Sequence, residues 1–232
     1  MNIEIWIDFT CPFCYLGKNR LFKAMNRFKH KEDVHITYRS YLLSPNEDNY
    51  DNLNSHSWLA KHKDISIEEA NRLNHTVELM AFEDGIALDL SRVIPRNTLF
   101  AHQIMQHLSG EAQLKFVEMV YEAHFQQYLD ISNIDVLSTL AKTVGLSFES
   151  VLEIIHQKQY LNLIQQDIDL STRFGLKGVP FFILNRKYSI SGAQDELYFF
   201  DTLEELYFET RPKKPTKTTY CVGDHCERQP KK

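Results

Sequence analysis

Two closely spaced pairs of cysteines lie near opposite ends of this chain of 232 residues. Cys11 and Cys14 form a Cys-Pro-Phe-Cys sequence, and Cys221 and Cys226 enclose four residues near the C-terminus. A pair at either spacing can cycle between a dithiol and a disulfide, bind a metal ion or lie inert in a core. The elements that position each pair decide which of these chemistries is open to it.

The first pair follows a predicted strand and opens a predicted helix. Alternation places four apolar residues on one face of the strand, Ile3, Ile5, Ile7 and Phe9. The residues on the other face are Glu4, Trp6 and Asp8. After Cys14 the apolar spacing becomes helical, and a second alternating run covers residues 34–39. We therefore predict a strand–helix–strand unit in which Asp8 faces away from the isoleucines.

Cys11 is expected at the start of this helix, where unpaired backbone N–H groups and the helix dipole favour a negative charge. They favour the thiolate, which is the attacking species in disulfide exchange. Pro12 fits the first helical turn, because an N–H there would have no partner. Cys14 lies one turn further on, within reach of a mixed disulfide on Cys11. This placement predicts a dithiol that cycles.

Two other interpretations of the cysteines stay open. Cys11 and Cys14 are half of a possible zinc site that Cys221 and Cys226 would complete, or they are inert core residues. Zinc knuckles usually occupy turn-rich ribbons, and two cysteines rarely fall between a strand and a helix by accident. A zinc-binding or chaperone-like module, with a groove in the helical block, is the alternative from another functional class.

The rest of the chain is predicted to form a long helical segment, followed by a segment that contains both strands and a helix. Residues 44–174 carry helical spacing almost throughout, beginning with a capping box at Ser66 and Glu69. Two short strands are then predicted at Phe181–Leu184 and Tyr188–Ser191. A closing helix is predicted from Asp195 to Thr210, with four side chains facing inward: Leu197, Phe200, Leu203 and Tyr207.

This element order, βαβ, helical block, ββα, is that of an α/β thioredoxin-like fold with a large all-helical insertion. We predict a discontinuous thioredoxin-like domain at residues 1–43 and 175–210, an insertion domain at 44–174, and a linker and cysteine-bearing tail at 211–232. In this architecture the loop Gly178-Val179-Pro180 lies beside the cysteines and its X-Pro bond is cis, a form almost confined to proline.

The sequence resembles the DsbA-like thiol oxidoreductases, most closely the FrnE-like subgroup. The resemblance covers nearly the whole chain and rests on four stretches: Asp8-Phe9-Thr10-Cys11-Pro12-Phe13-Cys14-Tyr15-Leu16-Gly17, Arg96-Asn97-Thr98 with Ala101-His102, Gly178-Val179-Pro180-Phe181-Phe182, and Ser191-Gly192-Ala193-Gln194. Members of the subgroup can also carry a C-terminal Cys-x₄-Cys, which residues 221–226 match.

The resemblance implies a thiol–disulfide oxidoreductase in which Cys11 attacks, Cys14 resolves and a cis-Pro180 aligns the substrate. The expected substrate-binding residues are Pro12, Phe13, Val179 and Pro180. In the type members, a histidine between the two cysteines contributes to their oxidising strength. The dipeptide between the cysteines of this chain lacks that histidine. Kappa-class glutathione transferases and 2-hydroxychromene-2-carboxylate isomerases have a similar fold and an Asn-Thr-x-x-Ala-His stretch. They act through a serine with bound glutathione, and the presence of Cys11 and Cys14 here speaks against that chemistry.

Secondary candidates lie in the helical block and in the tail. Asn97 and His102 are candidates for a cleft beside the cysteines, although a helix cap and a packed core histidine are the simpler interpretations. Cys221 and Cys226 are candidates for a second redox pair that exchanges electrons with Cys11 across the linker Thr210–Thr219. The alternative is a local disulfide that pins the tail.

Composition narrows the function classes further. The formal charge is −5, so no overall basic field attracts nucleic acid or anionic lipid. The N-terminus carries no secretory signal pattern, and no apolar stretch approaches the roughly 20 residues that span a bilayer. We therefore expect a cytoplasmic protein, monomeric or homodimeric, that acts on thiol or disulfide substrates. We expect no metal and no tightly bound cofactor, with glutathione as a candidate thiol co-substrate.

Overall fold

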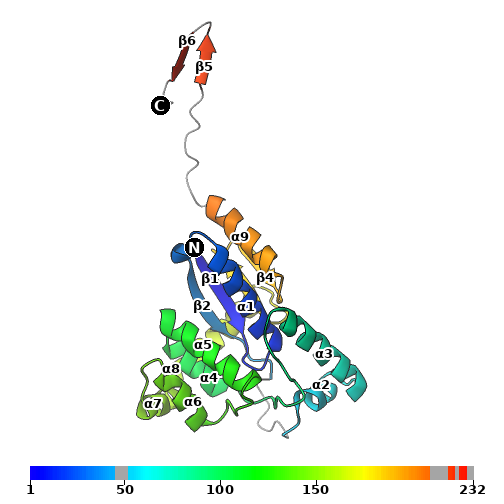
Figure 1. Cartoon of the computed structure of the whole chain (residues 1–232). Helices are drawn as coiled ribbons and strands as arrows, with labels where there is room; N and C mark the ends of the chain where they lie inside the picture. The colour runs from blue at the N-terminus through cyan, green and yellow to red at the C-terminus, as the bar shows by residue number, and fades with distance from the viewer. Residues whose placement is uncertain (45–51, 210–218, 223–224, 229–232) are drawn as a thin grey trace.

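The computed structural model describes residues 1–44 and 52–209, together with the backbone of residues 219–222 and 225–228. Its elements follow the predicted order (Figure 1). The N-terminal unit consists of β1 (Asn2–Ile7), α1 (Pro12–Arg27), a 3₁₀ turn (Lys31–Asp33) and β2 (His35–Ser40). The later part of the sheet consists of β3 (Phe181–Leu184) and β4 (Tyr188–Ser191), followed by α9 (Glu196–Glu209).

The four strands form one mixed sheet in the order β2-β1-β3-β4. β1 pairs with β2 in parallel, as the crossover through α1 requires, whereas β3 is antiparallel to β1 and β4 is antiparallel to β3. α1 and α9 pack together on one face of this sheet (Figure 1). The ring of Phe182 lies between them, 4.8 Å from the ring centroid of Phe199. This arrangement is the predicted α/β thioredoxin-like fold.

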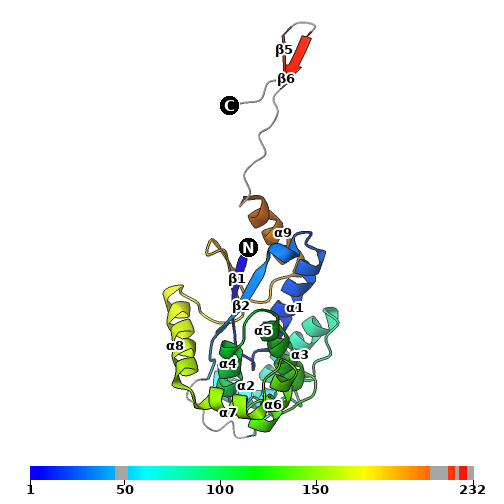
Figure 2. The same cartoon turned by 90° about the vertical axis from the view of Figure 1, so that its left-hand side faces the viewer.

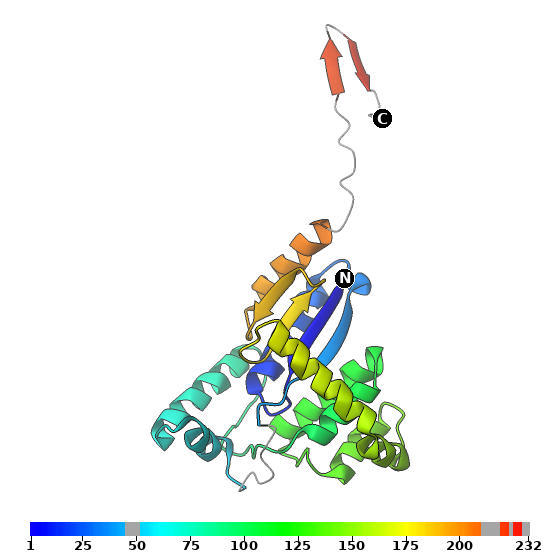
Figure 3. The same ribbon diagram turned by 180° about the vertical axis from the view of Figure 1, so that it is seen from behind.

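The second face of the sheet is covered by α8 (Lys158–Arg173), which lies on the opposite side of the sheet from α1 (Figures 2 and 3). The indole N–H of Trp6 donates a hydrogen bond of 3.0 Å to the backbone carbonyl of Asp167 on α8. Trp6 is buried in this contact and Asp8 is also buried, so the face of β1 opposite the isoleucines is covered as well. β1 is a central strand covered on both faces, so period-two alternation does not mark a solvent side there.

The inserted block is all-helical, as predicted. Its helices are α2 (Ser55–Lys63), α3 (Ile67–Glu83), α4 (Leu99–His107), α5 (Gly110–Phe125), α6 (Ile134–Lys142), α7 (Phe148–His156) and α8. α2 and α3 form one pair, and α4 to α7 gather on the other side of the sheet (Figure 1). α4, α5 and α8 all contact β2, so the block is packed onto the sheet. The proposed domain boundaries stay a prediction.

Helix α5 also closes one edge of the sheet. The side-chain oxygen of Gln113 accepts a hydrogen bond of 3.0 Å from the backbone N–H of Tyr38 in β2. The amide nitrogen of Gln113 donates to the carbonyls of Met105 and Leu108, at 3.1 and 3.2 Å. One buried amide therefore occupies the N–H of Tyr38 at the open edge of β2, and the carboxylate of Asp167 occupies that of Ser40 at 2.8 Å, so these groups are not available for pairing.

The inward face of α9 differs in part from the prediction. Leu203 and Tyr207 are buried as expected, but Leu197 is 60% exposed and Phe200 is only partly buried. Phe199 and Leu206 are buried instead. The face of α9 that meets α1 is thus rotated by part of a turn from the face that the apolar spacing predicted. Nearly every turn of α9 carries more apolar residues than one face can bury, so the spacing alone did not identify the buried set.

The C-terminal cysteines lie on a β-hairpin that the sequence did not predict. β5 (Thr219–Val222) and β6 (His225–Arg228) form a separate two-stranded antiparallel sheet (Figure 1). Cys221 and Cys226 are directly opposite partners in its register. The predicted linker lies, except for its last residue, outside the described residues.

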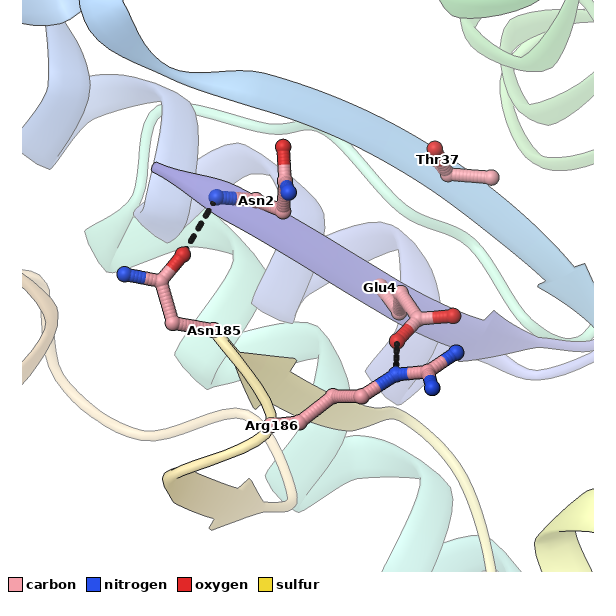
Figure 4. Close-up of a pocket in the computed structure, with 5 residues that line it drawn as sticks. All are labelled: Asn2, Glu4, Thr37, Asn185 and Arg186. Atoms are coloured by element: carbon pink, nitrogen blue, oxygen red, sulfur yellow. Dashed lines mark hydrogen bonds and ion pairs between the residues drawn. The ribbon is translucent and has the colours of Figure 1, made fainter.

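A polar hollow of about 520 Å³ lies at the end of β1 farthest from the cysteines, between Asn2, Glu4, Thr37, Asn185 and Arg186 (Figure 4). Asn185 accepts a hydrogen bond of 2.7 Å from the backbone N–H of Asn2, and Arg186 pairs with Glu4 at 3.3 Å. These contacts fix the β3–β4 turn against β1. The hollow therefore belongs to the scaffold of the sheet.

Candidate active site

Cys11 occupies the position immediately before the first residue of α1. Its backbone N–H donates to the carbonyl of Asp8 at 3.1 Å, and its own carbonyl accepts the N–H of Cys14 at 3.0 Å. Pro12 fills the first helical position, and no side chain caps this helix end. The positive end of the α1 helix dipole thus lies beside Cys11, where it favours a negatively charged sulfur.

The loop before β3 meets this helix end. The Val179–Pro180 peptide bond is cis. The Cys11 sulfur lies 3.6 Å from the carbonyl oxygen of Val179, within the range of a thiol hydrogen bond. Phe13, between the two cysteines, is 39% exposed and presents its ring at the surface. The structure thus brings Cys11, Cys14, Val179 and Pro180 into one site.

The two thiols of this site have unequal surroundings. Both are free, but Cys11 is 6% exposed and Cys14 is fully buried. Burial raises the pKa of the Cys14 thiol well above its usual range, and a hydrogen bond with the Cys11 side chain adds to this effect. Cys14 is therefore held as a neutral thiol, next to a cysteine at a helix N-terminus.

Gly17 lets the helix and the loop approach each other, and sequence reasoning did not single it out. A Cβ atom at this position would lie 3.0 Å from the Cγ atom of Pro180 and 3.2 Å from the Cζ atom of Phe182. No larger residue fits without a shift of its neighbours. One sequence feature could have identified Gly17. It follows Cys14 by less than one turn of a helix that was predicted to lie beside the cis-proline loop.

Asp8 is a second residue whose importance emerges only from the structure. It is 2% exposed, and its side chain accepts hydrogen bonds from Thr10, Leu43 and Thr98. The alternation of β1 alone did not reveal this set, because two of the donors come from distant parts of the chain.

His102 lies in the core. It is fully buried, and its ring centroid is 4.9 Å from that of Phe9. Within the part of the chain that the structure describes, neither ring nitrogen has a hydrogen-bond partner. Burial lowers the pKa of His102 to about 4, so the imidazole is neutral near pH 7. The structure therefore places His102 behind the site and not in a cleft beside it.

Asn97 lies just before α4, one position earlier than the helix cap. Its side-chain oxygen accepts a hydrogen bond of 2.9 Å from the backbone N–H of Leu99, whereas the N-cap position itself is held by Thr98. Asn97 thus stabilises the start of the helix. The prediction that it caps α4 is displaced by one residue.

The second cysteine pair can be described by its backbone alone. The hairpin register sets Cys221 opposite Cys226. Directly opposed residues of antiparallel strands have Cα atoms about 4.5–5.5 Å apart, and disulfides need about 4.4–6.8 Å. This backbone therefore permits a Cys221–Cys226 disulfide. Among the side chains of residues 1–44 and 52–209, no group of three or more potential metal ligands occurs.

The chain matches the model of the DsbA-like thioredoxin domain over residues 2–205. It is similar to the crystal structure of the probable DsbA oxidoreductase SCO1869 from Streptomyces coelicolor, with 28% identity, a TM-score of 0.80, and coverage of 99% of this chain and 100% of that one. No helix in the described residues is long and apolar enough to cross a membrane.

Two further solved structures share the fold at lower identity. A 2-hydroxychromene-2-carboxylate isomerase has a TM-score of 0.68 at 18% identity, over 90% of this chain and 97% of its own. The cytosolic disulfide reductase DsbM from Pseudomonas aeruginosa, in a structure with GSH, has a TM-score of 0.63 at 15% identity, over 90% and 100%. The family match spans most of the sequence, and the chain belongs to the DsbA-like thioredoxin family of thiol oxidoreductases.

Proposed function

We propose that this protein is a thiol–disulfide oxidoreductase that works through the Cys11–Cys14 dithiol. One observation carries the proposal: Cys11 lies at the N-terminus of a helix, whereas the neighbouring Cys14 thiol is fully buried. Cys11 stands at the N-terminus of α1 beside the carbonyl of Val179. Cys14 is buried and has a raised pKa, first because of burial. Cys11 therefore supplies the nucleophile, and Cys14 stays protonated until it is needed.

In the first step the thiolate of Cys11 attacks one sulfur of a substrate disulfide. A Cys11–substrate disulfide forms, and the other substrate sulfur leaves as a thiolate. Cys14 then loses its proton, and its sulfur attacks the Cys11 sulfur. The Cys11–Cys14 disulfide forms and the second substrate sulfur leaves. Two electrons pass from the dithiol to the substrate, whose two sulfurs take up one proton from Cys14 and one from water.

The surroundings of Cys11 suit a polypeptide or thiol substrate. Pro12 and Phe13 flank it on the helix side, and Val179 and Pro180 flank it on the loop side. The half-exposed ring of Phe13 adds an apolar contact for the substrate. We assign glutathione as the co-substrate that returns the disulfide to the dithiol in the cytoplasm. Two glutathione molecules would each give one electron and leave as glutathione disulfide.

The isomerase and transferase chemistry of the wider superfamily is the alternative. That chemistry uses a serine with bound glutathione and has no use for a resolving thiol. Here the Cys14 side chain is hydrogen-bonded to Cys11 and buried behind it. A second thiol in this position favours disulfide exchange.

The second cysteine pair is proposed to exchange electrons with the first. α9 begins beside the site, because the N–H of Gly192 donates to the carbonyl of Pro180 at 2.9 Å. Its 14 residues span about 21 Å, so the chain leaves α9 roughly that far from Cys11. The stretch Thr210–Thr219 reaches at most about 33–36 Å. This length is sufficient for Cys221 and Cys226 to return to Cys11, at an effective concentration in roughly the millimolar range.

Reduction of insulin coupled to dithiothreitol or glutathione tests the main proposal. The Cys11→Ser variant should lose the activity, and a Cys221→Ser/Cys226→Ser double variant with Cys11 intact should keep a measurable part of it. Retained activity in Cys11→Ser would remove Cys11 from the mechanism.

Disulfide trapping tests the exchange between the two pairs. In a Cys14→Ser variant, Cys11 cannot be resolved locally, so rapid quenching should reveal a Cys11–Cys221 or Cys11–Cys226 disulfide by peptide mapping. Mixed disulfides with external thiols alone would show that the tail pair does not act on Cys11.

A further inference from the structure

The side chain of Arg20 connects three parts of the fold beside the dithiol. Arg20 lies on α1, one turn after Gly17, and is 6% exposed. Its Nε atom donates a hydrogen bond of 2.6 Å to the carboxylate of Asp84, at the end of α3. Its Nη1 atom donates a hydrogen bond of 2.8 Å to the backbone carbonyl of Ala193, between β4 and α9. One buried guanidinium therefore joins the first helix, the inserted block and the later part of the sheet.

The β4–α9 connection, residues 192–195, supports the loop that carries the cis-proline. The backbone N–H of Gly192 donates a hydrogen bond of 2.9 Å to the carbonyl of Pro180. Gly192 has a φ of +77°, in the left-handed region that glycine adopts without strain. The next residue is Ala193, whose carbonyl accepts the hydrogen bond from Arg20. Two hydrogen bonds, made by adjacent residues, therefore link the guanidinium to Pro180.

A second cation from the same helix holds Asp84 but does not reach this connection. The Nζ atom of Lys23 donates a hydrogen bond of 2.6 Å to the backbone carbonyl of Asp84 and lies 3.5 Å from its carboxylate. The side chain of Lys23 is 41% exposed, against 7% for that of Arg20. In the described part of the chain, the polar contacts of the Lys23 side chain are with Asp84 alone. Lys23 is therefore the matched control for the part of Arg20 that reaches Ala193.

Stability alone does not account for a buried guanidinium at this place. Two apolar side chains could hold α1 against α3 about as well as a buried ion pair does. A guanidinium differs because its donors are fixed in one plane, so Arg20 sets the directions of both Asp84 and Ala193 at once. The β4–α9 connection is therefore held at a defined place relative to α1, the helix that begins directly after Cys11 and carries Cys14.

We propose that Arg20 is a positioning residue for polypeptide substrates of the disulfide exchange proposed above, on which this inference rests. Through Ala193 and Gly192 it holds the cis-proline loop at the distance from Cys11 that lets an extended substrate chain lie along the loop. An extended peptide binds largely through the backbone of its partner, so its binding depends on where that backbone lies. A small disulfide needs only the Cys11 sulfur. Arg20 therefore favours polypeptide disulfides over small ones.

Single-turnover oxidation of the dithiol tests this role in the full-length chain carrying Cys221→Ser and Cys226→Ser, the parent for this experiment. The reduced protein is mixed with increasing concentrations of an uncharged disulfide-bonded peptide or with hydroxyethyl disulfide, and the remaining thiols are counted by alkylation and intact mass. In Arg20→Met the half-saturating peptide concentration should rise about tenfold, because a small misplacement of an aligning group has a large effect on the reaction. The rate with hydroxyethyl disulfide should stay within about twofold of the parent, because it depends on the thiolate.

Two further variants separate the contacts of Arg20. Lys23→Met also removes a cation from Asp84 but leaves Ala193 untouched, so both reactions should stay within about twofold of the parent. Arg20→Lys keeps a positive charge beside Asp84 but lacks the planar fork, so it should show the peptide defect with a smaller loss of thermal stability than Arg20→Met.

Equal half-saturating peptide concentrations in folded Arg20→Met and Lys23→Met would overturn the proposal. A loss of the same size with both disulfides would also overturn it, because it would show general damage to the site. If Arg20→Met fails to fold, as shown by its thermal transition, Arg20→Lys decides by the same comparisons. Failure of the parent itself to react with either disulfide would contradict the proposed function, and that failure is recognised by the behaviour of the parent alone.

Discussion

Gly17 of α1 lies directly against Pro180, with no room for a side chain between them. A Cβ atom on Gly17 would be 3.0 Å from the Cγ atom of Pro180 and 3.3 Å from the Cα atom of Ala193. Cys14 precedes Gly17 on the helix, and Pro180 follows the residue whose carbonyl faces Cys11. This contact therefore sets the separation between the dithiol and the loop that is proposed to align the substrate.

The Gly17→Ala variant should be destabilised by about 1–3 kcal/mol, because overpacking here pushes α1 away from a backbone segment and not only from a flexible side chain. Urea unfolding measures the change. Gly178→Ala is the matched control in the same loop region: a Cβ there meets nothing within 4 Å, so its effect should stay within about 0.5 kcal/mol. Equal effects of the two substitutions would show that the contact is not tight.

His102 should make the protein sensitive to acid. Burial lowers its pKa to about 4, against about 6.5 in the unfolded chain. A depressed pKa means that the unfolded state binds the proton more readily, so stability is complete above about pH 6.5 and is lost as the pH falls toward 4. The loss from one such histidine is about 3 kcal/mol.

Burial likewise lowers the pKa of His124 to about 4, so two histidines contribute to the acid sensitivity. In His102→Leu, the free energy of unfolding between pH 6.5 and pH 4 should fall by about 3 kcal/mol less than in the parent. The account of His102 fails if His102→Leu loses as much stability over this pH range as the parent.

The closed edge of β2 gives a separate prediction. Gln113→Leu leaves the buried N–H of Tyr38 and the carbonyls of Met105 and Leu108 without this partner. Chemical denaturation should show a loss of about 2–4 kcal/mol, since each unsatisfied buried group costs about 1–3 kcal/mol. Gln159→Leu, at an exposed position of α8, should change stability by less than about 0.5 kcal/mol. A comparably small loss in Gln113→Leu would mean that the edge is not held by this amide.

The thioredoxin-like order of elements was predictable because its signals are local. Period-two alternation marked β1 and β2, and turn residues bounded β3 and β4 at the predicted residues Phe181–Leu184 and Tyr188–Ser191. Cys11 at the start of a helix followed from the change of period alone. Each of these features depends on residues within a few positions of one another.

The features that were missed or misplaced depend on contacts between distant segments. Alternation placed Trp6 and Asp8 on the face of β1 opposite the isoleucines, but it could not show that α8 and the start of α4 cover them. Gly17 gains its meaning only when the loop before β3 packs on α1. In α9 nearly every turn is apolar, so spacing alone could not indicate that Leu197 is exposed. Such contacts cannot be inferred from the period of a single element.

The most direct test of the account is covalent capture of a substrate on Cys11. The full-length chain carrying Cys14→Ser, Cys221→Ser and Cys226→Ser keeps Cys11 as its one thiol and is incubated with a disulfide-bonded peptide. Intact-mass measurement and peptide mapping should find one peptide attached through Cys11, and dithiothreitol should release it. A folded variant that forms no such adduct would contradict the assignment of Cys11 as the attacking thiol.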